Sequence, residues 1–312
     1  MAKAASDHPV ILYIPGLKPK PEPEAHAREL RRCLIEGVRR VDETVAAEIR
    51  ELPAAFDLVS WTYDFYGEHR DIALDLPAIE DGLQQSGATA LDRSEAASWQ
   101  RRLLRWIYRV ADHLPFLIPQ VATPDMEIHL RDLRRYVRDE NEMGEFTRRL
   151  LKVPLRAAAK AGRPVLLLAH SMGSVIAYDA LWQLSHGSGD TPEVDLFVSM
   201  GSPLGQNLIQ RRLLGFGRDR ASRYPVNITR WINIAAYGEL TALDMTLAND
   251  FADMRDLGCV DSIEDYEIWN YFRMDGYLNV HAEYGYLVNE VTGRVIRDWW
   301  REKSREARGQ PG

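Results

Sequence analysis

The sequence predicts an α/β fold in which a mostly parallel sheet is flanked by helices. Three short apolar runs bounded by turn residues, Val10–Ile14, Val165–Ala169 and Val194–Met200, are typical of strands buried on both faces of a parallel sheet. Segments with the apolar repeat of amphipathic helices lie between them. Strands that alternate with helices in this way indicate parallel strands joined by helical crossovers.

The remaining elements follow in chain order. A helix is expected over Glu24–Val41, where Leu30, Cys33, Leu34 and Val38 share one side and arginines lie opposite. Two more strands are expected over Leu58–Tyr63 and Trp231–Tyr237, and two more helices over Phe146–Ala161 and Val175–Leu184. We interpret residues 1–312 as a single domain built on this sheet.

Residues 67–130 interrupt the alternation and predict a helical insertion that resembles a cap. Ser94–Leu114 is expected to form one amphipathic helix, followed by the apolar segment Pro115–Pro119. Its apolar face holds Trp99, Leu103, Trp106, Ile107, Val110 and Leu114, and another face holds Arg101, Arg105 and Arg109. The apolar face either lines an acyl pocket or packs on the body of the protein, and the insertion is either a mobile lid or fixed packing.

Composition excludes several classes of protein. The chain has 39 basic and 46 acidic residues and a net charge of −7, which argues against a nucleic-acid-binding protein. Cys33 and Cys259 are too few for a disulfide framework or a zinc cluster, and we expect both to pack as small apolar groups. Acidic residues among the arginines of the insertion argue against contact with a membrane surface.

Location and metal content are also predicted from sequence patterns. The apolar run near the N-terminus is too short for a signal peptide, and no window reaches the roughly 20 apolar residues of a membrane-spanning helix. We therefore expect a cytoplasmic protein. No metal-ligand spacing occurs around His69 or His129, so we expect neither a metal nor another cofactor.

The segment Pro164–Asp179 carries the clearest chemical signal. A buried strand passes through Ala169, His170, Ser171, Met172 and Gly173 directly into a helical pattern, which is the context of a nucleophilic serine on a sharp strand-to-helix turn. Small neighbours two residues on either side allow the strand and helix to approach. We expect Ser171 to be a nucleophile rather than an ordinary turn residue.

Two other readings of these turns are excluded. No GxxxxGK[ST] or GxGxxG pattern follows a strand, so a phosphate-binding turn is not expected. Ser202 also follows a strand, but the next residue is Pro203, which has no backbone N–H to stabilise an oxyanion. We therefore expect Ser202 to be a turn residue.

The general base is predicted by elimination. In folds with this type of turn the chain order is serine, then Asp or Glu, then histidine, and only His186 and His281 follow Ser171. His186 lies too close to Ser171 for a strand carrying the acid to fit between them. We therefore predict that His281 is the base.

The acid is expected just after the strand Trp231–Tyr237. Glu239 follows this strand directly, after a glycine that permits a tight turn, and Asp244 lies five residues later. We prefer Glu239 and keep Asp244 as the alternative. An oxyanion is expected to bind the backbone N–H groups of Met172 and of Leu17, where Gly16 allows the loop after the first strand to bend toward the nucleophile.

These motifs, taken in order, resemble the α/β-hydrolase superfamily, most closely its lipase- and esterase-type members. The resemblance spans residues 10–65 and 131–300 and rests on AHSMG at the elbow, GSPLG after the next strand, NIAAYGELTA around the acid and HAEYGY around the histidine. It departs from the superfamily in two places, with Pro15–Gly16 where many members have His-Gly and Glu239 where Asp is commoner.

The resemblance implies that Ser171 attacks an acyl carbonyl, His281 transfers the proton and Glu239 orients His281. The expected function is that of a serine esterase acting on a small-molecule carboxylic ester. Two alternatives remain, a catalytically silent hydrolase-fold binding protein and a thioesterase or acyltransferase with the same triad. The sequence predicts neither an acyl chain length nor an oligomeric state.

Overall fold

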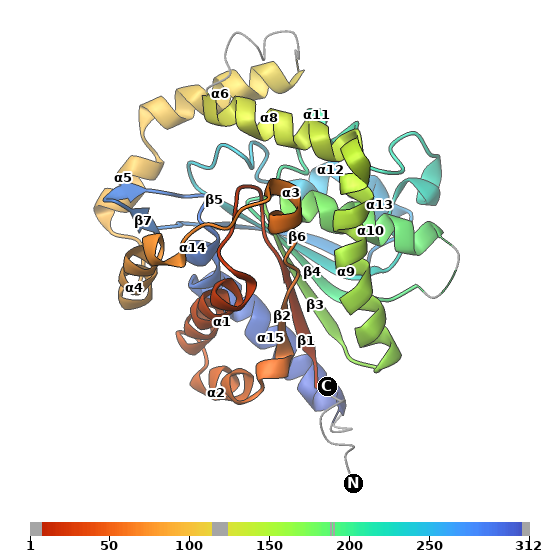
Figure 1. The fold of residues 1–312 in the computed structure, drawn as a ribbon, viewed down its shortest axis with the longest axis horizontal. Coiled ribbons are helices and arrows are strands. Elements are labelled where there is room, and N and C mark those ends of the chain that lie inside the picture. The colour runs from red at the N-terminus through yellow and green to blue at the C-terminus, as the bar shows by residue number, and fades with distance from the viewer. Residues whose placement is uncertain (1–7, 114–123, 188, 190, 308–312) are drawn as a thin grey trace.

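The computed structural model describes residues 8–113, 124–187, 189 and 191–307 and has an α/β fold built on a parallel sheet (Figure 1). Six strands pair in the order β2-β1-β3-β4-β5-β6, and each pair is parallel. They are β1 (Val10–Ile14), β2 (Phe56–Leu58), β3 (Val165–His170), β4 (Val194–Met200), β5 (Ile228–Ala236) and β6 (Ser262–Ile268). Because the strands are parallel, all of their carboxyl ends lie at one edge of the sheet.

Helices and short turns connect these strands. The α-helices are α1 (Pro23–Arg39), α2 (Glu43–Glu51), α3 (Thr62–Tyr66), α4 (Leu76–Gln84), α5 (Ala90–Ala96), α6 (Trp99–His113), α8 (Pro124–Val137), α9 (Met143–Lys160), α10 (Met172–His186), α11 (Asn207–Gln210), α12 (Leu247–Asp250), α13 (Ala252–Asp256), α14 (Glu283–Leu287) and α15 (Glu290–Ala307). A small antiparallel hairpin, β7 (Arg273–Met274) and β8 (Tyr277–Leu278), precedes α14. Short 3₁₀ segments lie at Pro53–Ala55, Ile72–Leu74, Glu140–Glu142 and Arg220–Arg223.

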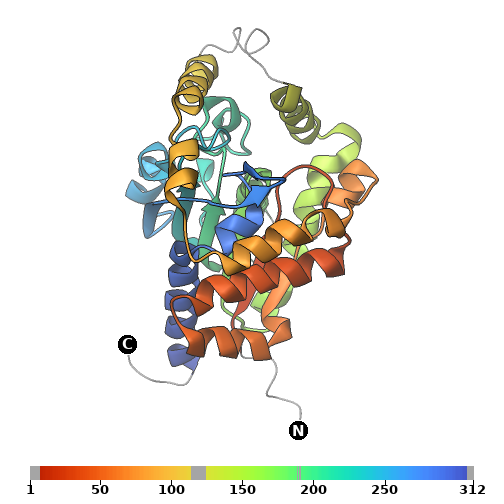
Figure 2. The same cartoon turned by 90° about the vertical axis from the view of Figure 1, so that its left-hand side faces the viewer.

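Two apolar cores cover the two faces of the sheet. Side chains of β1 alternate between them: Leu12 and Ile14 pack in the core with α9 and α10, and Ile11 and Tyr13 pack in the core with α1, α14 and α15. The helices α1 and α15, from opposite ends of the chain, lie side by side on the second face (Figures 1 and 2). Such burial on both sides explains why the central strands are continuous apolar runs.

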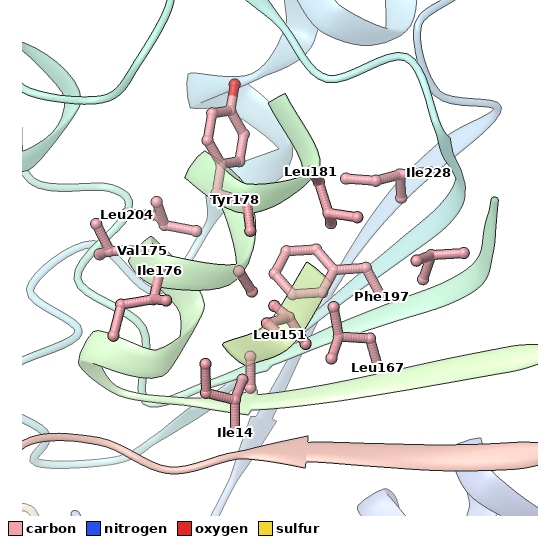
Figure 3. Packing of buried hydrophobic residues seen from close by; sticks show 14 of the residues in the cluster. Ile14, Leu151, Leu167, Val175, Ile176, Tyr178, Leu181, Phe197, Leu204 and Ile228 are labelled. Atoms are coloured by element: carbon pink, nitrogen blue, oxygen red, sulfur yellow. The ribbon is translucent and has the colours of Figure 1, made fainter. Parts of the chain in front are cut away.

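The core beneath α10 fixes the helix that begins at the candidate nucleophile. Leu181 of α10 and Leu151 of α9 pack with Phe197 of β4 and Leu167 of β3 (Figure 3). All four side chains are fully buried. Removing such a side chain costs about 2–5 kcal/mol of unfolding free energy, so the position of α10 is set by packing rather than by its own helix propensity.

The central strands agree with the sequence prediction, but the segment Leu58–Tyr63 does not. The strand β2 ends at Leu58, and α3 begins at Thr62. Trp61 and Phe65 are buried nevertheless, and the indole N–H of Trp61 donates to the carbonyl of Pro15 at 2.9 Å. The apolar pattern therefore arises from a buried turn and helix, which a short apolar run does not distinguish from a strand.

The strand β6 was not predicted. It is the last strand of the sheet and, among the described strands, pairs with β5 alone, and its central residues Glu264, Tyr266 and Glu267 are exposed. Edge strands carry charged side chains of this kind, so the apolar-run criterion misses them.

The insertion contains helices and, among its described residues, no strand. The single helix expected over Ser94–Leu114 is instead two helices, α5 and α6, because α5 ends at Ala96 and α6 begins at Trp99. A capping box between Thr89 and Asp92 starts α5. Leu114 and the segment Pro115–Pro119 lie outside the described residues.

The two cysteines and the hydropathy of the helices were also the subject of predictions. Cys33 and Cys259 are both free and buried. No helix in the described ranges has the length and apolar character needed to cross a membrane.

A buried carboxylate in α10 makes fold stability depend on pH. Asp179 is 2% exposed and accepts hydrogen bonds from the Tyr136 hydroxyl at 2.9 Å and the Leu214 N–H at 2.8 Å. Burial raises the pKa of Asp179 to about 6, against the opposing effect of these two donors and of Arg148. The native state therefore holds this proton at a pH where the unfolded chain has released it.

We predict that this carboxylate lowers stability as the pH rises from about 4 to about 6. The unfolded state ionises first, so the unfolding free energy of the wild type should fall by about 2–3 kcal/mol relative to Asp179→Asn across this interval and stay level above it. Urea denaturation of both proteins from pH 3.5 to 8 measures the difference. A difference that does not change with pH would contradict the prediction.

Candidate active site

Ser171 lies on a strained turn between β3 and α10. Its backbone has φ 53° and ψ −126°, a conformation that is costly for any residue with a side chain. The Ser171 N–H still donates to the Met200 carbonyl of β4 at 2.9 Å, and the Ser171 carbonyl accepts from the Ser174 N–H and hydroxyl. The sheet and the helix thus hold the turn from both sides, with the hydroxyl at the carboxyl edge of the sheet.

Two glycines allow this turn to sit against the loop after β1. A Cβ atom on Gly173 would lie 2.5 Å from the carbonyl oxygen of Ile14 and 2.6 Å from that of Pro15. A Cβ atom on Gly16 would lie 2.7 Å from the Cβ of Ser171. Both positions therefore require glycine for close approach.

The imidazole of His281 meets the hydroxyl of Ser171. The distance from His281 Nε2 to Ser171 Oγ is 2.9 Å, although the two residues are 110 positions apart in the chain. The His281 N–H donates to Asn279 Oδ1 at 3.1 Å, and the ring of His170 donates from Nε2 to the His281 carbonyl at 2.9 Å. The side chain of His281 is 27% exposed, so the site is open to solvent on this side.

Glu239 lies on the other side of the imidazole. Its Oε2 is 2.8 Å from His281 Nδ1 and also accepts from the Tyr286 hydroxyl at 3.2 Å. Its Oε1 accepts from the N–H groups of Leu240 and Thr241, both at 3.0 Å. The carboxylate is 1% exposed, and these four donors occupy both of its oxygens.

The electrostatics of this pair fix the tautomer of the imidazole. Burial alone would raise the pKa of Glu239, but the charge of His281 and the hydrogen bonds from His281, Thr241 and Tyr286 outweigh it and lower the pKa. An ionised carboxylate only accepts, so Nδ1 of His281 carries the proton. Nε2 is left with a lone pair directed at the Ser171 hydroxyl.

The alternative acid, Asp244, forms its hydrogen bonds with Thr246 and not with His281. Its Oδ1 accepts from the N–H and the hydroxyl of Thr246 at 3.0 and 2.9 Å, which closes a local turn.

His186, rejected as the base, and Ser202, rejected as the nucleophile, have hydrogen-bond partners other than Ser171, His281 and Glu239. His186 bonds to the Tyr224 carbonyl, and Ser202 is a buried turn residue whose Oγ is 2.7 Å from Ser174 Oγ.

Two backbone N–H groups beside Ser171 are available for an oxyanion. Met172 is the first residue of α10, where the helix dipole favours negative charge, and Leu17 is in the loop held against the elbow. Within the described part of the chain, neither the Met172 N–H nor the Leu17 N–H donates to another group. The Trp61 indole, whose role no sequence pattern indicates, anchors this loop through Pro15.

The insertion contacts the two loops that carry Glu239 and His281. Arg101 donates to the carbonyls of Gly238 and Leu278 at 3.3 and 3.1 Å. Arg105 and Arg109 both donate to the Leu243 carbonyl, at 3.2 and 3.0 Å. The arginine face of α6 therefore packs inward on main-chain carbonyls.

Of the two alternatives for the apolar face of α6, this orientation contradicts the one in which the face packs on the body of the protein. Trp99, Leu103 and Trp106 are 69%, 47% and 63% exposed, so they do not pack on the body of the protein. Loop carbonyls need hydrogen-bond donors, and the arginine face supplies them. Amphipathicity alone does not show which face of such a helix turns inward.

Comparison of the chain with models of known protein families, with curated proteins and with solved structures found no match. The chemical interpretation therefore rests on the geometry described above.

We predict that Gly173→Ala destabilises the protein although alanine favours helices. The added Cβ would overlap two carbonyl oxygens of the β1 loop, so the unfolding free energy should fall by about 2 kcal/mol or more. Gly82→Ala in α4 is the matched control, because its Cβ would make only an ordinary 3.5 Å contact with Phe272. Chemical denaturation of both variants measures the difference, and equal stabilities would contradict the prediction.

Proposed function

We propose that this chain is a serine hydrolase of the α/β-hydrolase type, which cleaves a carboxylic ester through an acyl-enzyme on Ser171. The observation that carries the proposal is the continuous chain of contacts from Ser171 Oγ through His281 to Glu239, at 2.9 and 2.8 Å. A serine, a histidine and a buried carboxylate in this geometry are the parts that nucleophilic acyl transfer needs.

In the proposed first half-reaction, Ser171 Oγ attacks the ester carbonyl carbon as its proton passes to His281 Nε2. The oxyanion of the tetrahedral intermediate accepts hydrogen bonds from the N–H groups of Leu17 and Met172. His281 then gives its proton to the leaving alkoxide. The alcohol departs and an acyl group remains on Ser171.

In the second half-reaction, a water molecule attacks the acyl carbonyl and gives its proton to His281. The exposed side of the imidazole gives water access to it. Collapse of the second intermediate returns the proton to Ser171 Oγ and releases the carboxylic acid. Glu239 stays ionised throughout and stabilises the imidazolium that forms in each half.

The chain order supports the assignment to this type of fold. The proposed nucleophile follows β3, the acid follows β5 and the histidine follows β6, which is the order serine, acid, histidine of α/β-hydrolases. Thioester cleavage or acyl transfer would use the same triad. The solvent-accessible imidazole favours water as the acceptor.

We expect a fluorophosphonate probe to label the wild-type protein and not Ser171→Ala. The probe forms a covalent bond with an activated serine as fluoride leaves, so labelling reports the nucleophile without knowledge of the substrate. Ser202→Ala is the matched control, because Ser202 also follows a strand of the sheet but its hydroxyl bonds to Ser174, whereas His281 bonds to Ser171. It should be labelled like the wild type. Absence of labelling in the wild type would support a silent hydrolase fold.

We also expect Glu239→Gln to lose far more ester hydrolysis than Asp244→Asn. The amide cannot hold the imidazole in the required tautomer, so kcat for a short p-nitrophenyl ester should fall by about 10³-fold or more. Asp244→Asn keeps an oxygen to accept from Thr246 and should stay within about twofold of the wild type. Equal losses in the two variants would show that the acid is assigned wrongly.

A further inference from the structure

A second buried carboxylate, Glu283, lies two residues after His281 and has no part in the proposed reaction. It is the first residue of α14 and is 5% exposed. Its Oε1 accepts from Lys20 Nζ at 2.8 Å and bonds to His26 Nε2 at 3.0 Å, and its Oε2 accepts from the Tyr13 hydroxyl at 3.0 Å. A buried charge with this many partners is costly to assemble, so it calls for an explanation.

The partners of Glu283 belong to segments that build the site. Tyr13 is on β1, and Lys20 is in the loop after β1 that also contains Leu17. His26 is on α1, which packs against α14. The carboxylate therefore joins the loop that offers an oxyanion N–H to the turn that carries His281.

His170 lies between this cluster and the imidazole of His281. It directly precedes Ser171, its Nε2 donates to the His281 carbonyl at 2.9 Å, and the two imidazole rings are 4.7 Å apart between centroids. Its Nδ1 is buried, has no hydrogen-bond partner among the residues that the structure describes, and lies 3.9 Å from Glu283 Oε2. A charge at Glu283 therefore acts electrostatically on His170, which in turn contacts His281, the proposed base.

Glu283 and His170 differ in their state of charge. Burial alone would raise the pKa of Glu283, but Lys20, His26 and His170 outweigh it and hold the pKa well below its usual range. Burial, together with the charge of His281, lowers the pKa of His170 well below its usual value. Near neutral pH Glu283 is therefore ionised, in the ion pair with Lys20, and His170 is neutral.

We propose that Glu283 is a positioning residue for the reacting groups. It locks the loop after β1 to the turn that carries His281, and its negative charge offsets Lys20 so that the imidazole of His281 accepts the proton of Ser171. This inference rests on the proposed hydrolase function and assigns a role to a group outside the triad.

Charged and titratable groups from several packed elements face Glu283 and His281. Glu283 is faced by Tyr13 of β1, Lys20 of the following loop, His26 of α1, Asp75 before α4, His170 of β3 and its own neighbour Tyr284. His281 is faced by Glu239 and His170. Lys20 is the cation at hydrogen-bond distance, so charge substitutions at Glu283 and Lys20 should act in opposite directions.

The test is the rate of fluorophosphonate labelling against pH for Glu283→Gln, Lys20→Met and the double variant. Glu283→Gln leaves Lys20 unbalanced, which disfavours imidazolium, so the acid limb of the profile should move down by about 1 pH unit, with a plateau rate about tenfold or more lower. Lys20→Met should move the limb up. The double variant should return the limb toward the wild type but keep the lower plateau.

Asp179→Asn is the matched control, because it also converts a buried carboxylate to an amide, but this carboxylate bonds to Tyr136 and Leu214, which have no part in the proposed site. Its labelling profile should match the wild type. If Glu283→Gln and Lys20→Met lower stability but leave the acid limb and plateau unchanged, Glu283 is only a structural residue and the proposal is wrong.

A second measurement keeps this result separate from the proposed function. If the wild type is not labelled, the hydrolase proposal fails, but the coupling can still be measured by NMR titration of the imidazole nitrogens. We expect the His281 signal, assigned with His281→Gln, to titrate at lower pH in Glu283→Gln and at higher pH in Lys20→Met. An unchanged titration in both variants would overturn the inference.

Discussion

The geometry of the site depends on the close approach of the loop after β1 to the first turn of α10. No side chain fits between them at Gly16 or Gly173. Ser171 lies at this contact, with a backbone φ of 53°. The strain at Ser171 is sustained because its N–H remains in the sheet, bonded to Met200, and because α10 is packed into the core. A looser core under α10 would let the turn relax and move the hydroxyl away from His281.

The site contains two buried carboxylates whose surroundings give them different roles. Glu239 receives hydrogen bonds from two backbone N–H groups, a tyrosine and His281, and no lysine or arginine is among these four donors, so its charge acts on the imidazole. Glu283 is neutralised mainly by Lys20 and holds segments together instead. The difference follows from the donors: a backbone amide orients a carboxylate without cancelling its charge, whereas an ammonium group cancels it.

The sequence predicted the central strands and the meeting of Ser171, His281 and Glu239, because buried strands are continuous apolar runs and parallel strands bring their carboxyl ends together. It missed β6, whose edge position makes Glu264 and Glu267 acceptable in a strand. The roles of Tyr286 and His170 were also missed, since a side chain that supports another residue leaves no spacing pattern of its own. Glu283 and Tyr286 both lie in the HAEYGY motif beside His281. Their partners come from distant parts of the chain, so their roles could be seen only in the folded structure.

The helix α6 shows that an amphipathic pattern does not by itself determine the orientation of a helix. Its arginines, spaced four apart, form a row that matches the irregular carbonyls of two loops, and such carbonyls are satisfied only by donors. The carbonyl of Gly238 directly precedes Glu239, and a Cβ atom on Gly238 would lie 2.4 Å from the Ala96 carbonyl at the end of α5. The insertion therefore packs closely against the turn that carries Glu239. Its contribution to the site is to fix that turn through main-chain contacts, which leaves the tryptophans of α6 facing outward.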